Sequence, residues 1–159
     1  MTLRARMVAS WVLVAAWACF IFFMSAHTGA DLDGGSDLVG RIKAWLDGIQ
    51  SALLGEGVDA VSSIAHFCEY LVFGALLNNA LRHHVPLRCA LIAAVLVASL
   101  YGITDEVHQL FVPGRACDPV DWLVDTAGAA TGSLLLWLMA RRKCSEAESE
   151  ASRKSREAA

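Results

Sequence analysis

The stretch Ala90-Leu-Ile-Ala-Ala-Val-Leu-Val-Ala-Ser-Leu-Tyr-Gly-Ile-Thr-Asp-Glu-Val-His-Gln-Leu-Phe-Val-Pro-Gly-Arg115 decides the fold. Its first half has the composition of a membrane-spanning helix, and it continues without a polar linker into several ionisable residues. A charged side chain at membrane depth is costly unless it faces a partner or a wet cavity. The stretch therefore predicts a helix that crosses a bilayer and carries functional side chains at one end.

The composition extends this prediction to the whole chain of 159 residues. Hydrophobic residues make up 56% and charged residues 18%, a balance typical of a small membrane protein. A bilayer-spanning helix needs about 20 apolar residues, and four segments qualify: about residues 7–25, 60–81, 88–110 and 119–140. We predict an all-α fold, an integral membrane four-helix bundle over residues 1–143. A polar tail, 144–159, is expected to be cytoplasmic and partly disordered.

Two segments allow more than one interpretation. Residues 7–25 resemble a signal peptide, but the apolar run is too long and lacks a small-x-small cleavage site, which favours an uncleaved span. Between the first two spans, residues 36–54 repeat apolar side chains at helical spacing and predict an outer amphipathic helix. That helix either lies on the membrane surface or covers the bundle as a lid.

Lysine and arginine placement predicts the orientation. Basic residues precede the first span, frame the second connection and follow the fourth span, at 4, 6, 82, 88 and 141–143. The third connection carries Arg115 alone, and the long first connection mixes Arg41 and Lys43 with several acids. Because cytoplasmic loops carry the excess of Lys and Arg, both termini are expected in the cytoplasm, with residues 26–59 and 111–118 on the outer side.

Polar side chains on three predicted spans converge at one depth. These are His66, Glu69 and Tyr70 on the second span, Tyr101, Asp105, Glu106, His108 and Gln109 on the third, and Asp121 and Asp125 on the fourth. Residues three or four apart share a helix face, and the alternating directions of the spans bring these faces to the outer leaflet. Acids outnumber bases there, so protons, Arg115 or a bound cation must balance part of the charge.

Structural interpretations compete with a functional one. Asp118 and Asp121 lie at a helix start, where capping explains them, with Pro119 as the first helical residue. Gly128 and Gly132 are spaced as a helix-packing face. His66 and Glu69 are also explained as hydrogen-bonding links between helices, although a bundle does not need so many acids to hold together.

A metal site receives weaker support. His66-x-x-Glu69 and Asp105-x-x-His108 each place two ligand types on one helix face, as metal-binding bundles do. This spacing is generic, and no further signature accompanies it. We therefore predict neither a metal ion nor another cofactor.

These residues resemble the VanZ-like family of small bacterial membrane proteins. The matching features are Ala65-His-Phe-Cys-Glu-Tyr70 with Gly74, Tyr101-x-x-x-Asp-Glu-x-His-Gln109, Val112-Pro-Gly-Arg115, and Asp121 followed by Gly128 and Gly132. The resemblance covers roughly residues 60–135, and Asp125 stands where the family is expected to carry Asn. It implies a role in the cell envelope, since the name-giving member is associated with low-level resistance to the glycopeptide teicoplanin.

Three functions remain open at the level of sequence. The first is binding of an anionic envelope component or lipid-linked cell-wall precursor, with Arg115 holding the anion and Tyr70, Tyr101, Gln109, Asp121 and Asp125 assisting. The second is a hydrolase or transferase in which His66 or His108 is the base, oriented by Glu69 or Asp105, with a carboxyl group such as Glu106 as acid. The third treats the charges as buried structural pairs. Membrane lipids are expected partners, and nucleic acid is not.

Overall fold

A computed structural model describes residues 2–26, 45, 60–112 and 117–157 of the chain. Its main elements are the four helices α1 (Leu3–Ser25), α4 (Ala60–Leu81), α5 (Leu87–Gln109) and α6 (Pro119–Glu157). Each is long and apolar enough to cross a membrane. The predicted four-helix, all-α architecture is therefore confirmed. The amphipathic helix predicted over 36–54 lies outside the described residues, apart from Trp45.

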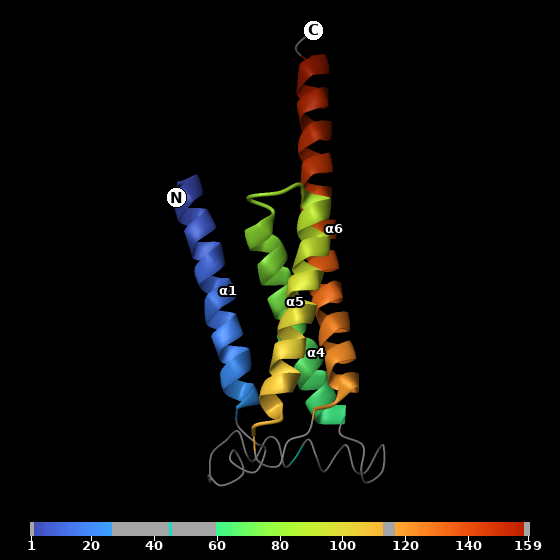
Figure 1. Ribbon diagram of the computed structural model, residues 1–159. Helices are drawn as coiled ribbons and strands as arrows, with labels where there is room; N and C mark the ends of the chain where they lie inside the picture. Colours follow the sequence, from blue (N-terminus) through green and yellow to red (C-terminus); the bar gives the residue numbers. More distant parts are fainter. Residues whose placement is uncertain (1, 27–44, 46–59, 113–116, 158–159) are drawn as a thin grey trace.

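The helices run alternately up and down, so the connections fall at two ends of the bundle (Figure 1). The N-terminal end of α1, the α4–α5 connection and the C-terminal part of α6 lie toward one end. The end of α5 and the beginning of α6 lie at the other. Within residues 2–26, 60–112 and 117–143, the Lys and Arg residues lie toward the first of these ends and the Asp and Glu residues toward the second.

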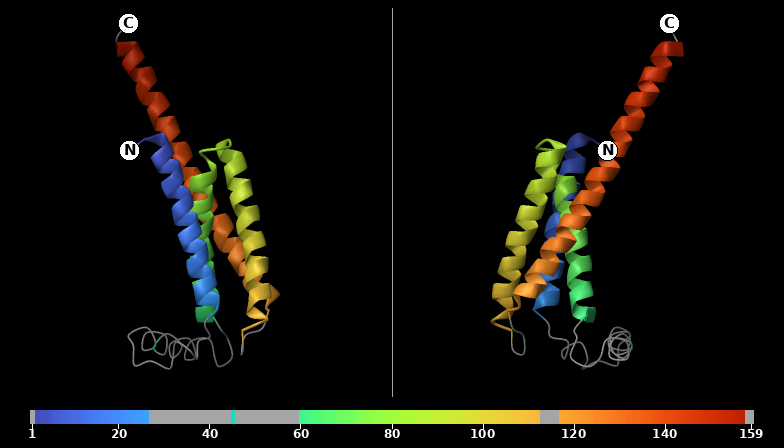
Figure 2. Two further views of the ribbon diagram at one scale, coloured as in Figure 1. Left: turned by 60° about the vertical axis from the view of Figure 1, so that its left-hand side comes forward. Right: turned by 90° about the vertical axis from the view of Figure 1, so that its right-hand side faces the viewer.

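The core consists of α4, α5 and α6, with α1 at its side. Helices α4 and α6 make the most extensive contact, and α1 contacts α4 and, to a smaller extent, α5. In the described residues, α1 has no comparable contact with α6. The side position of α1 is visible in Figure 2.

Helix α5 shows why the helices pack as they do. Ala90, Ala94, Ala98 and Gly102 recur every four residues and are all buried against the neighbouring helices. The opposite face exposes large apolar side chains, as lipid contact requires: Ile92, Leu96, Leu100, Ile103 and Val107. The small residues allow close approach of the helices, and their stripe leads directly to the buried Asp105 and Glu106.

Helix α6 differs from the prediction at its C-terminal end. It continues as a helix to Glu157, whereas the sequence predicted a span ending near residue 140 and a partly disordered tail. The physical reason is local, because alanine, glutamate, lysine and arginine favour helix even without tertiary contacts. Glu150 and Lys154, one turn apart, form an ion pair of 2.7 Å on this extension.

The start of α6 agrees with the prediction. Pro119 is the first helical residue, and the Asp118 carboxylate accepts a hydrogen bond of 2.8 Å from the backbone N–H of Val120. A carboxylate at this position satisfies an N–H group that the helix itself leaves without a partner. The capping role of Asp118 is confirmed.

Candidate functional site

The close contact between α4 and α6 depends on glycine. A Cβ atom at Gly132 would collide with the backbone carbonyl of Leu71, and one at Gly128 with that of Phe67. Gly74 of α4 is equally tight against the backbone of Ala129. The predicted packing face of α6 is therefore real. Asp125 lies on the same packing face, about one turn closer to the start of α6. The glycine contacts therefore hold Asp125 against α4.

His66 of α4 and Asp125 of α6 form a buried pair. His66 Nδ1 lies 3.2 Å from Asp125 Oδ1, and Asp125 is completely buried. From the sequence, Glu69 was predicted to be the carboxylate that orients His66. In the structure, the hydrogen bond of the His66 ring is with Asp125. Helix periodicity places both acids near His66. The glycine contacts fix the rotation of α6 about its own axis, and this rotation turns the Asp125 side chain toward His66.

Tyr70 lies one turn from His66 and is fully buried. Its hydroxyl group has no hydrogen-bond partner among the residues that the structure describes. Asp125 Oδ2 also lacks one, because the contact with His66 uses the other oxygen. Two polar atoms from different helices thus remain unsatisfied beside the buried pair, a condition that native proteins rarely leave unexplained.

Helix α5 contributes Asp105 and Gln109 to the same end. Both are buried, and the Gln109 side-chain amide donates a hydrogen bond of 3.4 Å to Asp105 Oδ2. Asp105 Oδ1 has no hydrogen-bond partner within residues 2–26, 60–112 and 117–157. About one helical turn before Asp105, Gly102 brings the α5 backbone close to Asp125 and Tyr70. All three helices of the core therefore meet at this point.

Glu106 has a clear structural role. Its Oε2 atom accepts a hydrogen bond of 2.7 Å from the backbone N–H of Asp118, which links α5 to the start of α6. Its Oε1 atom is buried and has no hydrogen-bond partner in the described part of the chain. Glu106 therefore fixes one end of the connection that carries Arg115, and this use reduces its availability as an acid catalyst.

Tyr101 and His108 turn toward α1. The Tyr101 hydroxyl donates a hydrogen bond of 2.7 Å to the backbone carbonyl of Ala18. The His108 ring stacks on Phe22 with ring centroids 4.3 Å apart, and no described residue forms a hydrogen bond with its buried Nε2 atom. These two side chains connect α1 to the core. Sequence periodicity placed them correctly on the stripe of α5 but gave no information about α1.

The remaining predicted residues lie at the margin. Asp121 and Glu69 are half-buried, and the backbone carbonyl of Glu69 accepts a hydrogen bond of 2.9 Å from Trp17 Nε1. Arg115 lies outside the described residues. We use the name acidic end for the part of the bundle that holds the five carboxylates Glu69, Asp105, Glu106, Asp121 and Asp125.

Trp122 was not among the site residues predicted from the sequence. Its indole Nε1 donates to the backbone carbonyl of Ser99 at 3.1 Å, and its ring edge faces Gly102 beside Asp125. Its position in the sequence was only a weak indication of a role at the site, because tryptophan near the end of a membrane span is ordinarily an interfacial anchor. In this fold Trp122 closes one side of the acidic end.

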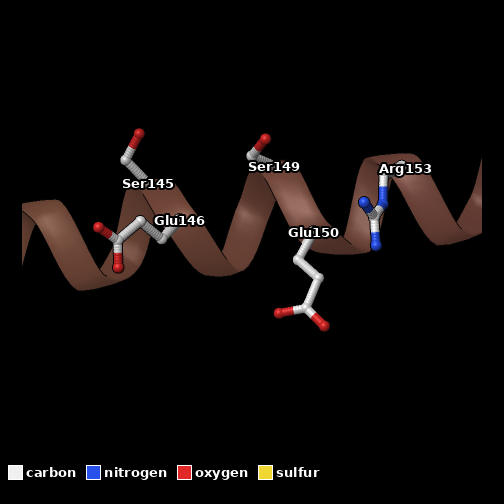
Figure 3. A pocket seen from close by; sticks show the side chains of 5 residues that line it. All are labelled: Ser145, Glu146, Ser149, Glu150 and Arg153. Carbon is white, nitrogen blue, oxygen red and sulfur yellow. The ribbon is translucent and has the colours of Figure 1, made fainter.

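No metal centre is evident in the described residues. No group of three His, Cys, Asp or Glu side chains there stands in an arrangement that could hold a metal ion. A shallow hollow lies on the extension of α6, lined by Ser145, Glu146, Ser149, Glu150 and Arg153 (Figure 3). Since all five residues belong to one helix beyond the bundle, we assign no function to it.

Comparison with known proteins gives one match. The model of the family described as VanZ/LLP1 matches residues 10–140, most of the chain and all three helices of the acidic end. No curated protein and no solved structure matches the chain.

Proposed function

We propose that this chain, which belongs to the VanZ-like family and is a multi-pass membrane protein, binds an anionic component of the cell envelope at the outer face of the bacterial plasma membrane. The ligand we propose is a lipid-linked cell-wall precursor. Glycopeptides such as teicoplanin act on these precursors, so binding would change susceptibility to them. The expected orientation, with both termini in the cytoplasm, places the acidic end at the outer leaflet.

One observation carries the proposal. Six buried polar atoms at the acidic end have no hydrogen-bond partner among the described residues: Ser25 Oγ, Tyr70 Oη, Asp105 Oδ1, Glu106 Oε1, His108 Nε2 and Asp125 Oδ2. A bundle that used its charges only as structural links would pair them, because each unsatisfied buried group costs about 1–3 kcal/mol. Unpaired groups at one end favour a site that a ligand completes.

Arg115 supplies the other half of the proposed recognition. It is the one Lys or Arg between residues 89 and 140, in the connection between α5 and α6. Both ends of that connection are held, since Glu106 bonds to Asp118 and the N–H of Val112 donates to the carbonyl of Gln109 at 3.0 Å. A guanidinium group binds phosphate through paired hydrogen bonds.

The Arg115→Ala substitution tests this assignment. We expect binding of a polyprenyl diphosphate in nanodiscs, followed by native mass spectrometry, to fall at least tenfold. Arg82→Ala is the matched control, because Arg82 is exposed in the α4–α5 connection at the opposite end. Equal retention of the lipid by the Arg115→Ala protein and the unchanged protein would reject the proposal.

A second candidate function rests on the His66–Asp125 pair. A buried carboxylate that orients an imidazole ring is the arrangement of a general base, which supports a hydrolase or transferase acting on a lipid-linked or cell-wall substrate. Release of phosphate or diphosphate from the same lipid in the same nanodiscs would favour this function over binding alone. Binding without any product would favour the first.

A further inference from the structure

Exposed cations gather at the end of the bundle opposite to the acidic end (Figure 1). They come from the beginning of α1, the α4–α5 connection, the beginning of α5 and the part of α6 that leaves the bundle: Arg4, Arg6, Arg82, Arg88, Arg141, Arg142 and Lys143. We use the name basic end for the surface that these seven residues form. Residues 2–26, 70–104 and 126–145 contain no Asp or Glu, and the first acid along α6 is Glu146, one turn beyond Arg142. The positive charge of the basic end is therefore not balanced from within the bundle.

Two tryptophans lie beside these cations. The guanidinium carbon of Arg141 lies 4.7 Å from the centroid of the Trp137 ring, one turn earlier on α6. On α1, Trp11 follows Arg6 by five residues, and its Nε1 donates a hydrogen bond of 3.0 Å to His84 Nε2 in the α4–α5 connection. Tryptophan is enriched where a helix passes from the acyl chains of a membrane into the head groups. The basic end therefore lies at the depth of the lipid phosphates.

An exposed apolar surface adjoins the cations on α1 and α6. Its large side chains are Leu3, Val8 and Val12 on α1 and Leu134, Leu135, Leu138 and Met139 on α6. A soluble acidic protein or a nucleic acid would bind the cations but would leave this apolar surface uncovered. A phospholipid matches both, because its phosphate meets the cations while its acyl chains cover the apolar side chains.

We propose that the basic end binds an anionic phospholipid through the arginines of α1, Arg4 and Arg6, and those of α6, Arg141 and Arg142. A guanidinium group binds phosphate through paired hydrogen bonds. Within the described residues, α1 and α6 make no extensive contact with each other, so the lipid connects two helices that the protein itself leaves separate. This inference goes beyond the proposed function, since it concerns a bulk membrane lipid at the opposite end of the bundle.

The first measurement uses the full, unchanged chain purified in detergent. Phosphatidylglycerol or phosphatidylcholine is titrated in, and native mass spectrometry gives the fraction of protein that carries lipid. We expect phosphatidylglycerol to bind at least about tenfold more tightly, because each Lys or Arg near a membrane surface strengthens the attraction to anionic lipid about fivefold. Equal affinity for the two lipids would overturn the proposal. Retention of a second copy of the chain in place of lipid would overturn it as well.

Two pairs of substitutions locate the binding. Arg4→Gln/Arg6→Gln and Arg141→Gln/Arg142→Gln are each expected to weaken phosphatidylglycerol binding by about tenfold or more. All four side chains are exposed, so circular dichroism should show an unchanged helix content. If one pair does not fold, the other decides, and an unchanged affinity for phosphatidylglycerol in that variant contradicts the proposal.

Arg153→Gln/Arg156→Gln is the matched control. It removes the same charge from exposed positions of the same helix, but Arg153 lies about 18 Å beyond Arg141 at the helical rise of about 1.5 Å per residue. That separation exceeds the screening length of about 10 Å at moderate ionic strength. We expect the control to bind phosphatidylglycerol like the unchanged protein, and a loss equal to that of the other pairs would show that only the net charge matters.

The two ends of the bundle can be measured separately. In nanodiscs made of phosphatidylglycerol, bulk lipid saturates the basic end, so a small amount of polyprenyl diphosphate reports on the acidic end. Loss of the preference for phosphatidylglycerol over phosphatidylcholine, with polyprenyl diphosphate still bound, rejects the lipid site alone. A retained preference without binding of polyprenyl diphosphate rejects the proposed function alone.

Discussion

Replacing Gly132 by leucine is expected to separate α4 from α6 and to destabilise the bundle by about 3 kcal/mol or more. Inserting atoms into a tight interface costs about 1–3 kcal/mol when side chains can move. The obstacle here is the backbone carbonyl of Leu71, which cannot move without displacing α4. Unfolding of the purified protein in mixed micelles, followed by circular dichroism, measures the loss.

The matched control is Ala127→Leu. Ala127 is on the same helix but exposed, so its enlargement meets lipid or detergent and not another helix. We expect a change of less than about 0.5 kcal/mol, as for surface positions in general. If both variants lose stability to the same extent, the glycine face does not hold the acidic end together.

Removing His66 is expected to produce the second large effect. Loss of one partner from a buried ion pair costs about 3–5 kcal/mol, because the remaining charge is left uncompensated. His66→Ala should therefore destabilise the bundle strongly, since Asp125 is fully buried. Removing both partners in His66→Ala/Asp125→Ala should cost less than the sum of the two single changes. The same unfolding measurement supplies all three values.

A strictly additive double mutant would show that His66 and Asp125 do not interact. The variants also separate the candidate functions. A structural pair predicts that bound lipid falls only in proportion to folded protein. A general base predicts that any turnover disappears in His66→Ala even among the molecules that remain folded.

Sequence periodicity predicted the spans and the convergence of polar groups, because both follow from local spacing. Asp118 and Pro119 were also predictable, since a helix start depends on a few adjacent residues. The pairing within the acidic end was not predictable in the same way. Periodicity indicates which residues share a face, but the rotation of a helix depends on its neighbours. The glycine contacts of α6 set that rotation and select Asp125 for His66.

The contacts of helix α1 are the largest difference between the candidate site predicted from the sequence and the site in the structure. After Arg6 it carries no charged residue, so its sequence does not indicate which of its faces meets the core. The backbone carbonyl of Ala18 nevertheless accepts the hydrogen bond of Tyr101, and the ring of Phe22 stacks on His108. A main-chain acceptor is available at every residue and leaves no mark in a sequence, which is why this arrangement required the structure.

The most direct test of the central claim is the side of the membrane on which the acidic end lies. Cys117, next to the start of α6, and Cys144, on its extension, are both free and exposed. Proteins that retain only one of these cysteines can be treated in spheroplasts with a membrane-impermeant maleimide. Partial desolvation and the nearby Glu106 carboxylate raise the pKa of the Cys117 thiol, so its thiolate, the reactive form, increases with pH, and labelling should be done near pH 8.5.

We expect Cys117 to be labelled in intact spheroplasts and Cys144 only after the membrane is broken. This result would place the acidic end and Arg115 outside the cell, where lipid-linked cell-wall precursors are exposed. The reverse pattern, with Cys144 labelled in intact spheroplasts and Cys117 protected, would place the acidic end in the cytoplasm and contradict the account.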